Sequence, residues 1–283
     1  MNEHDLFHRF IFEEHEIRGE LVRLEQSFID AFAQSDYPEA VQTLLGEALA
    51  ASVLLSGTLK FDGILSLQAR GNGPVTLLMA ECTHYRKVRA IAQYQNIPET
   101  VSSIQEQLGQ GQLVITIDPE KGQRYQGIIP MEKPDLSSCL EDYFTQSEQL
   151  ETTILLFCDE TGAAGMLLQK LPGYREDDET WNRLETLARS ITFEELRSLP
   201  AEQILHRLFH EEDVRLFPGE AVSFECSCSK ARCTAAIEAL GSDDAYTLVA
   251  EQGTITIDCQ FCAETYTFKK EELDTIFHTP PLH

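Results

Sequence analysis

Residues 65–79 read LSLQARGNGPVTLLM, and this stretch decides the class of fold. Apolar and polar residues alternate from Leu65 to Ala69, and the alternation resumes at Val75 after a glycine-rich turn at 71–73. Alternation with a period of two on both sides of such a turn is typical of a β-hairpin with one buried face. The sequence therefore predicts two antiparallel strands here.

Two more hairpins and two helices are predicted around this one. Alternating segments separated by turn residues predict strand pairs at 113–117 with 125–129 and at 153–158 with 164–169. Apolar residues at helical spacing predict helices over 38–59 and 134–144. Strands joined by hairpins, without regular βαβ alternation, indicate an α+β fold with an N-terminal mixed sheet and helices.

The composition changes after Leu171-Pro172-Gly173, where an acidic run at 176–179 begins a segment without strand pattern. We therefore expect three parts: an N-terminal α+β domain over 1–173, a helical linker over 174–219 and a small C-terminal domain over 220–283 that contains paired cysteines.

The expected linker carries two apolar stripes at helical spacing. The first is Trp181, Leu184, Leu187 and Ile191, and the second is Ile204, Leu205, Leu208 and Phe209. Thr192 and Glu195 fit a capping box, so the helices are short and separately capped. Isolated helices below about 12–15 residues are marginal in water, so the linker should be stable only while it is docked.

Composition excludes several classes of partner. The chain has 283 residues, 42% of them hydrophobic, and a formal charge of −25, which repels nucleic acid and anionic lipid. The N-terminus lacks the basic and apolar regions of a secretory signal, which predicts a cytoplasmic protein. The longest strongly apolar uncharged stretch, 48–59, falls short of the roughly 20 residues that cross a bilayer.

Four of the eight cysteines form two close pairs, Cys226-Ser227-Cys228 and Cys259-Gln260-Phe261-Cys262, which are 30 residues apart. Each short pair can hold one metal ion from one turn, and the long spacer lets both pairs close a tetrahedron. Four thiolates suit zinc best. The sequence therefore predicts one zinc ion per reduced chain, held by these four cysteines.

Other interpretations of the four cysteines stay open: inert buried residues, an iron–sulfur cluster, or a structural zinc ribbon that docks on RNA or protein. Two features favour a redox switch. An extended C-x-C places its Cα atoms about 6.6 Å apart, so a disulfide there is strained and easily reduced. Lys230 and Arg232 follow closely and favour thiolates. The 4 basic against 11 acidic residues of 220–283 argue against RNA.

We assign no chemical role to the other cysteines or to the histidines at 206 and 210. Cys82, Cys139 and Cys158 are expected to be packing residues, and so is Cys233, although it could also replace a ligand or resolve an oxidised neighbour. The spacing of His206 and His210 can bind a metal, but we expect them to face solvent or pack. No nucleotide-binding, α/β-hydrolase or zinc-protease motif is present, so we expect no enzyme. Two alternatives remain: a zinc-stabilised interaction module, and a thiol–disulfide oxidoreductase, although its C-x-x-C lacks a thioredoxin-like setting.

The chain resembles the heat-shock protein 33 family, bacterial redox-regulated holdase chaperones, over essentially its whole length. The residues that carry the resemblance are Arg18-Gly19-Glu20-Leu21-Val22, Thr58-Leu59-Lys60-Phe61-Asp62-Gly63, Cys139-Leu140-Glu141-Asp142-Tyr143-Phe144, Ser147-Glu148-Gln149-Leu150, Gly165-Met166-Leu167-Leu168-Gln169 and the cysteine pairs. One departure is Ala263, where such a family often carries a glycine or asparagine that eases the turn.

The resemblance implies an ATP-independent chaperone that holds unfolding client proteins under oxidative stress. It implies an inactive, zinc-bound monomer when reduced. Oxidant and partial unfolding would then release zinc, form the disulfides Cys226–Cys228 and Cys259–Cys262, unfold the linker and promote a homodimer. As a hypothesis, the two apolar stripes of the linker then become client-binding surface.

Overall fold

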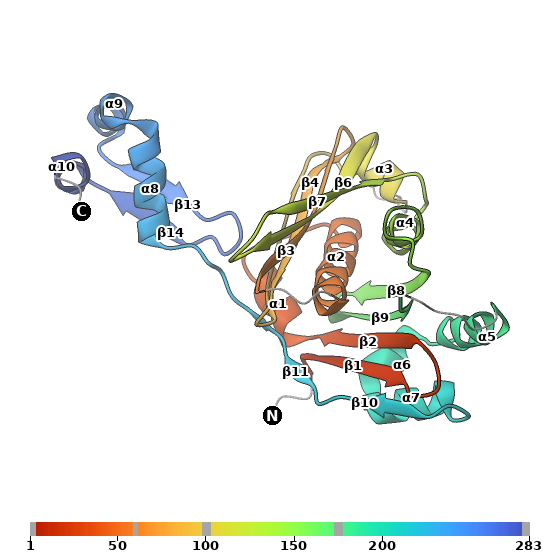
Figure 1. Ribbon diagram of the computed structural model, residues 1–283. Helices are drawn as coiled ribbons and strands as arrows, with labels where there is room; N and C mark the ends of the chain where they lie inside the picture. Colours follow the sequence, from red (N-terminus) through yellow and green to blue (C-terminus); the bar gives the residue numbers. More distant parts are fainter. Residues whose placement is uncertain (1–3, 59–61, 98–102, 173–177, 279–283) are drawn as a thin grey trace. The chain divides into compact units, whose positions relative to one another are not determined.

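The computed structural model describes residues 4–58, 62–97, 103–172 and 178–278 (Figure 1). The expected boundary between 173 and 174 and the centre of the motif at 58–63 lie outside these residues. The chain forms two compact units, Met1–Glu225 and Cys226–His283. Residues 220–225, which the sequence interpretation assigns to the zinc-binding domain, belong to the first unit.

The first sheet of the first unit, sheet A, has the strand order β10-β1-β2-β9-β8, and β11 also pairs with β1. All of these pairs are antiparallel. The strands are β1 (Leu6–Phe12), β2 (Ile17–Leu24), β8 (Thr152–Asp159), β9 (Gly162–Lys170), β10 (Val214–Leu216) and β11 (Glu220–Ala221). The hairpin β8–β9 confirms one sequence prediction.

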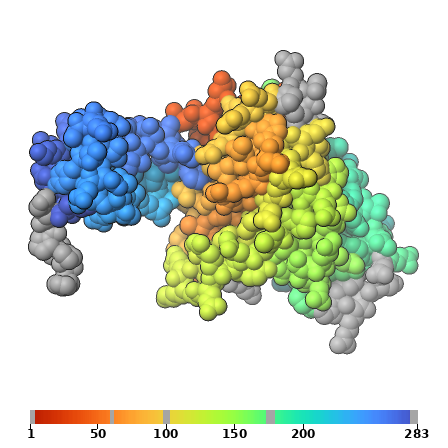
Figure 2. Space-filling model, turned by 90° about the horizontal axis from the view of Figure 1, so that it is seen from above, coloured from red at the N-terminus to blue at the C-terminus, as the bar shows by residue number. Residues whose placement is uncertain are grey.

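The second sheet, sheet B, has the order β12-β5-β4-β3-β6-β7, and only its β12–β5 pair is parallel among the described residues. Its strands are β3 (Gly63–Gly71), β4 (Val75–Thr83), β5 (Lys87–Tyr94), β6 (Gly111–Pro119), β7 (Tyr125–Pro130) and β12 (Ser223–Phe224). The hairpins β3–β4 and β6–β7 confirm two more predictions. In Figure 2, residues of sheet B, coloured from orange to yellow-green, cover much of the visible face of this unit.

Helix α2 (Glu39–Thr58) packs against strands of both sheets and forms the centre of the main core (Figure 1). It is long and apolar enough to cross a bilayer, but 72% of its most apolar window is buried inside the protein, as in a core helix. The smaller helices are α1 (Gln26–Phe32), α3 (Ile104–Leu108), α4 (Leu136–Tyr143) and the π-helix η1 (Phe144–Glu148). Helices α2 and α4 were predicted from sequence.

Three short helices cover the face of sheet A that is turned away from α2: α5 (Asp178–Ala188), α6 (Phe193–Ser198) and α7 (Ala201–Phe209) (Figure 1). The capping box of Thr192 and Glu195 begins α6 as predicted. Because these helices cover it, β9 is buried along its whole length, on both faces.

The second unit contains a two-stranded sheet, β13 (Ile255–Asp258) with β14 (Thr265–Phe268), and the helices α8 (Lys230–Leu240), α9 (Ser242–Gln252) and α10 (Lys270–His278). Its core of buried hydrophobic residues is Cys233, Ile237, Ala245, Val249, Ile255, Phe268 and Leu273. So small a core provides little stability of its own, which favours a unit that depends on a metal. The strand-like runs at 254–257 and 266–268 of the sequence predict both strands, whereas the three helices were not predicted.

Candidate metal centre and docked linker

The two cysteine pairs lie in two loops of the second unit. Cys226 and Cys228 follow β12 in an extended segment that ends where Ser229 caps α8 by accepting a hydrogen bond from the Arg232 amide. Cys259 directly follows β13, and Cys262 lies in the turn that leads to β14. The hairpin therefore presents one pair, and the segment before α8 presents the other.

The hairpin turn is closed by its own backbone. The Cys259 amide donates to the Glu264 carbonyl at 2.9 Å, and the Ala263 amide donates to the Cys259 carbonyl at 2.8 Å. Ala263 has φ 56°, in the left-handed region that glycine and asparagine occupy most easily. The departure noticed in the sequence therefore falls on the residue where the turn needs a left-handed conformation.

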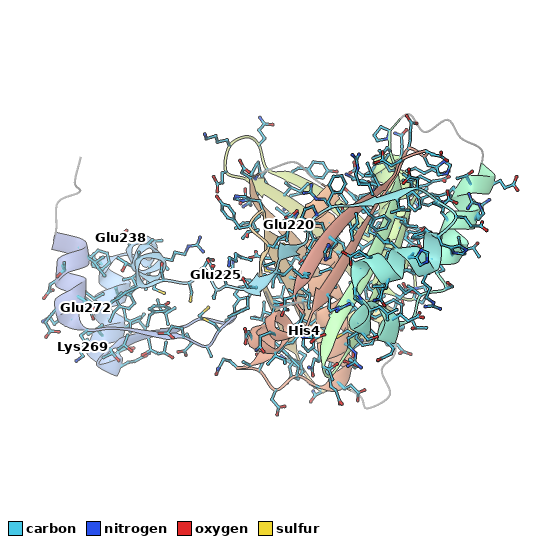
Figure 3. The ribbon with its side chains drawn as sticks, turned by 90° about the horizontal axis from the view of Figure 1, so that it is seen from below. His4, Glu220, Glu225, Glu238, Lys269 and Glu272 are labelled. Atoms are coloured by element: carbon cyan, nitrogen blue, oxygen red, sulfur yellow. The ribbon has the colours of Figure 1, made fainter. Side chains whose placement is uncertain are left out.

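The four sulfur atoms converge (sulfur is yellow in Figure 3). Cys226 Sγ lies 3.5 Å from Cys259 Sγ, Cys228 Sγ lies 3.4 Å from Cys262 Sγ, and all four atoms lie within 4.8 Å of one another. Four sulfurs bound tetrahedrally at about 2.3 Å from one zinc ion would lie about 3.8 Å apart. All four cysteines are free thiols, so this donor set fits a metal ion.

The thiols differ in acidity. Burial opposes ionisation of Cys259, but hydrogen bonds from the backbone of Phe261 and Cys262 lower the pKa of Cys259 to about 7. Burial raises the pKa of Cys226 and that of Cys262. The Tyr266 hydroxyl donates a hydrogen bond to Cys228 Sγ at 3.2 Å. Sequence reasoning missed Tyr266, although its place on a strand just after the second pair could have suggested it.

Of the two basic residues expected beside the thiols, the structure places one near them. Arg232 Nη1 donates to the Ser227 hydroxyl at 2.7 Å, within the C-x-C pair. Lys230 instead forms an ion pair with Glu272 of α10. Arg232 is therefore hydrogen-bonded within the C-x-C pair, whereas an acidic residue of α10 engages Lys230.

The cysteines outside the site are packing residues, as expected. Cys82 and Cys139 are buried in the main core, Cys158 packs against it, and Cys233 belongs to the core of the second unit. Burial raises the pKa of Cys82 to about 11 and also raises those of Cys139 and Cys158, which keeps these thiols protonated. His206 is exposed on α7, and His210 is exposed at the C-cap of that helix.

The two apolar stripes of the linker converge on sheet A. Seven of their eight residues are buried and Leu187 is partly buried. They share one cluster with the side chains of sheet A that point away from α2: Phe10, Phe12, Ile17, Leu21, Ala164, Met166 and Leu168. Sheet A thus supplies the docking surface that the stripes require.

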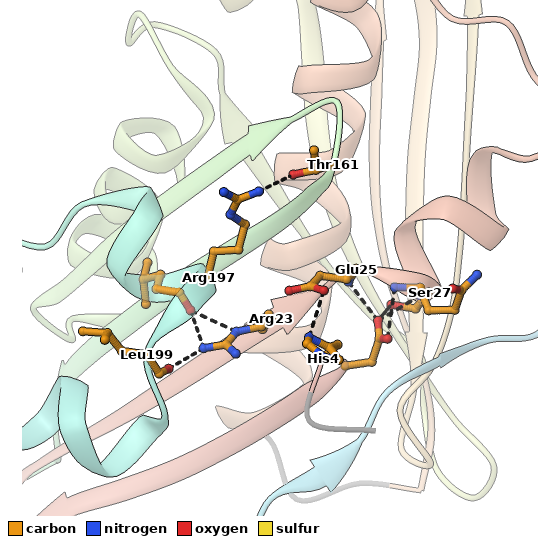
Figure 4. Close-up of polar contacts among 10 residues, drawn as sticks. His4, Arg23, Glu25, Ser27, Thr161, Arg197 and Leu199 are labelled. Atoms are coloured by element: carbon orange, nitrogen blue, oxygen red, sulfur yellow. Dashed lines mark hydrogen bonds and ion pairs between the residues drawn. The ribbon is translucent and has the colours of Figure 1, made fainter. Parts of the chain in front are cut away.

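One arginine of the sheet also holds the linker backbone (Figure 4). Arg23 of β2 donates from Nε and Nη2 to the Leu196 carbonyl, at 3.0 and 2.8 Å, and from Nη2 to the Leu199 carbonyl. These carbonyls end α6, where a helix leaves acceptors unpaired and favours a cation. No local sequence pattern marks Arg23, because its partners lie more than 170 residues away.

Comparison with known proteins places this chain in one family. The family model described as "Hsp33 protein" matches residues 5–269. The 33 kDa chaperonin of Hahella chejuensis is 47% identical over 282 residues, covering 99% of both chains. The 33 kDa chaperonin of Pseudomonas syringae pv. syringae is 48% identical over 280 residues, covering 96% of this chain and 93% of the relative.

A solved structure has the same fold. The crystal structure of the 33 kDa chaperonin, a heat shock protein 33 homolog, from Thermotoga maritima matches with a TM-score of 0.83. The match covers 96% of this chain and 97% of that one, at 20% sequence identity. The fold is thus retained where most of the sequence has changed. Together with the relatives of higher identity, these findings show that the chain belongs to the Hsp33 family of chaperones.

Proposed function

We propose that this protein is a redox-regulated, ATP-independent holdase that binds unfolding proteins and prevents their aggregation under oxidative stress. The observation that carries the proposal is the convergence of four thiols within 4.8 Å in a separate unit with a small core. The chain runs from the docked linker through residues 220–225 into this unit. A change of the thiols can therefore alter the anchoring of the linker.

The proposed ligands of one Zn²⁺ ion are Cys226, Cys228, Cys259 and Cys262. When bound, the metal would cross-link the two loops and supply folding free energy on the order of 10 kcal/mol. The chain contributes the geometry of the site: the capped start of α8 holds one pair, the closed hairpin turn holds the other, and Arg232 lies beside them.

Oxidation would remove the ligands as disulfides. When two thiolates form one disulfide, they release two electrons. One hydrogen peroxide molecule accepts these two electrons together with two protons and becomes two molecules of water. We propose the pairs Cys226–Cys228 and Cys259–Cys262. The closest sulfurs in the folded unit belong to opposite pairs, but neighbours in sequence stay close after the unit unfolds, because short loops cost the least entropy to close.

Release of the linker would then uncover client surface. Without a folded second unit, only the short strands β10, β11 and β12 hold the chain that follows the linker helices to the first unit, and short helices are marginal alone. The proposed client-binding surface comprises the two stripes Trp181, Leu184, Leu187 and Ile191, and Ile204, Leu205, Leu208 and Phe209, together with the face of sheet A that they leave. In the oxidised state this apolar surface would be exposed and could join two chains in a homodimer. In the reduced state it is covered, which favours a monomer.

The location follows from the thiol chemistry. Free thiols that can hold a metal persist in the reducing cytoplasm, so we propose a cytoplasmic protein. The proposal assigns no catalytic residue.

The test is light scattering from an unfolding client protein without ATP. The zinc-loaded reduced chain should not suppress aggregation, and the chain treated with peroxide at mild heat should suppress it. Zinc release, followed with a chromogenic chelator, should reach one ion per chain. If neither form suppresses aggregation, the site is structural and the chain is an interaction module; if both do, regulation by oxidation is wrong.

Two serine variants sharpen the test. Cys259→Ser removes a proposed ligand and should lower the bound zinc well below one ion per chain. Cys233→Ser changes a thiol of the same unit that lies outside the cluster of four, and should leave the zinc content unchanged.

A further inference from the structure

Residues 220–225 form a strap that lies along the edges of both sheets of the first unit. The strap contains β11, which pairs antiparallel with β1, and β12, which pairs parallel with β5. Figure 3 labels its two ends, Glu220 and Glu225. The next residue is Cys226, the first proposed metal ligand.

Hydrogen bonds between backbone groups hold the strap on the first unit, and these bonds do not depend on which side chains the strap carries. The Val222 amide donates to the Asp5 carbonyl at 2.9 Å, and the Ser223 amide donates to the Arg86 carbonyl at 3.1 Å. The Glu225 amide donates to the Val88 carbonyl at 3.1 Å. Any extended peptide can make such bonds, which is how sheet edges accept an added strand.

Alternate side chains of the strap fill apolar sites. Val222 is buried within the main core, and Phe224 is partly buried and packs against the same core. Between them, the Ser223 hydroxyl accepts a hydrogen bond from Lys87 Nζ at 2.8 Å. Pockets for every second residue are the usual source of selectivity in strand addition.

A charged site receives the first residue of the strap. Glu220 bonds to Arg9 Nη2 and to Arg86 Nε, each at 2.9 Å. The Arg86 guanidinium also donates to the Ser56 hydroxyl at 2.6 Å and lies 4.2 Å from the centre of the Phe7 ring. Arg86 is only 7% exposed, so a carboxylate at this position neutralises a cation that is mostly removed from water.

We propose that the strap is a built-in substitute for a client, and that an extended client segment takes its place once the strap is released. The segment that fits has an acidic residue followed by apolar residues two and four positions later, as Glu220, Val222 and Phe224 are spaced. This inference rests on the proposed function and names the kind of partner that the same chaperone would hold. Loss of the second unit frees one end of the strap, and its vacated edges then offer backbone partners, two apolar sites and a cationic site.

The first experiment uses a fluorescent peptide with the sequence of residues 219–225. Fluorescence anisotropy should show binding to the peroxide-activated full chain and none to the zinc-loaded reduced chain. A peptide with lysine in place of Glu220 should bind about tenfold more weakly, and one with serine at both apolar positions should bind as weakly. Equal binding of all three peptides would overturn the proposal.

The second experiment releases the strap without oxidant. Val222→Asp places a charge in the buried site and should let the reduced, zinc-loaded chain bind the peptide. Ala221→Asp introduces the same residue one position away, on an exposed side chain, and should leave the reduced chain unable to bind. Lack of binding by the activated form of Val222→Asp, or equal behaviour of the two reduced variants, would count against the strap.

The third experiment locates the peptide and separates this inference from the proposed function. A photo-crosslinking phenylalanine at the Phe224 position should react with β5, near Val88. Crosslinks confined to the linker helices would overturn the inference. It would also be overturned if the strap of a second copy of the chain occupied the vacated edges and kept the peptide from binding. If the activated chain suppresses client aggregation but the peptide neither binds nor competes, the strap inference fails and the holdase remains.

Discussion

Arg23 Nη2 donates a hydrogen bond to the Leu196 carbonyl at 2.8 Å, and this bond joins the second strand of the first unit to the end of a linker helix. Nε of the same side chain donates to the same carbonyl at 3.0 Å. Since one cation serves acceptors that the helix leaves unpaired, we infer that Arg23 sets how firmly the linker is docked.

We therefore expect Arg23→Gln to weaken docking by about 1.5–3 kcal/mol, the usual value of a hydrogen bond to a charged group. The fluorescence of Trp181, the only tryptophan, reports on the linker, and its thermal transition should move to lower temperature. Arg124→Gln removes an arginine from an exposed ion pair with Asp118 and serves as the control. Equal transitions in the two variants would show that Arg23 does not hold the linker.

A polar residue in the first apolar stripe should release the linker without oxidant. Leu184 is fully buried against sheet A, and truncation of a buried leucine costs about 2–5 kcal/mol. We expect Leu184→Ser, reduced and zinc-loaded, to suppress client aggregation, and Trp181 with Leu184 changed together to do so more strongly. Asn182→Ser alters an exposed neighbour and should stay inactive until oxidised; if Leu184→Ser also stays inactive, the stripe is not a regulatory cover.

The turn after the second cysteine pair should be stabilised by glycine. Ala263 occupies φ 56°, and removing its Cβ relieves a penalty of about 1 kcal/mol, part of which the added freedom of the unfolded chain offsets. Ala263→Gly should therefore raise the melting temperature of the second unit and slow zinc release under peroxide. Ala250→Gly makes the same change at an exposed site of α9, where it should destabilise by about 1 kcal/mol; a like sign for both would refute the explanation.

Buried Glu20 should make stability depend on pH. Burial raises the pKa of Glu20 from 4.5 to about 8, so the folded state keeps a proton that the unfolded chain loses. Its contribution is complete below pH 4.5 and is lost as the pH rises through about 8. The slope reaches at most about 1.4 kcal/mol per pH unit.

Denaturant unfolding of Glu20→Gln at pH 5, 6.5 and 8 tests this. The variant should lose less stability than the unchanged protein over this range, because its side chain carries no proton to lose. Glu39→Gln, an exposed change in α2, should retain the original pH dependence. If Glu20→Gln retains it too, Glu20 is not the source.

Local patterns predicted the elements that carry a regular spacing of apolar residues or a clear turn. The hairpins β3–β4 and β6–β7 were predictable because their alternation reflects one buried face, and β8–β9 because turn residues separate two apolar runs. Helix α2 was predictable because its apolar residues recur at helical spacing. Strand β2 was missed, since it is buried along most of both faces and so shows little alternation. Spacing likewise predicted the four converging cysteines, because close pairs bring their own ligands together.

What depends on distant partners could not be predicted. The stripes of the linker were visible in the sequence, but not the face of sheet A that they cover. The contacts of Arg23 with α6, and of Glu220 with Arg86, join residues more than 130 positions apart, so no local signal marks them. The strap was assigned to the zinc-binding domain because its pairing with β1 and β5 leaves no pattern within six residues.

Strand β9 is buried on both faces, although it belongs to an antiparallel sheet, because the linker helices cover the side that α2 does not. The apolar face of sheet A would not stay exposed to water for long once the linker helices leave it. The uncovered face must regain its own helices, take up a client or meet a second chain, and the fastest of these events decides the fate of the molecule. Activation would then be a kinetic competition, in which the local concentration of unfolding protein sets how long each molecule stays open.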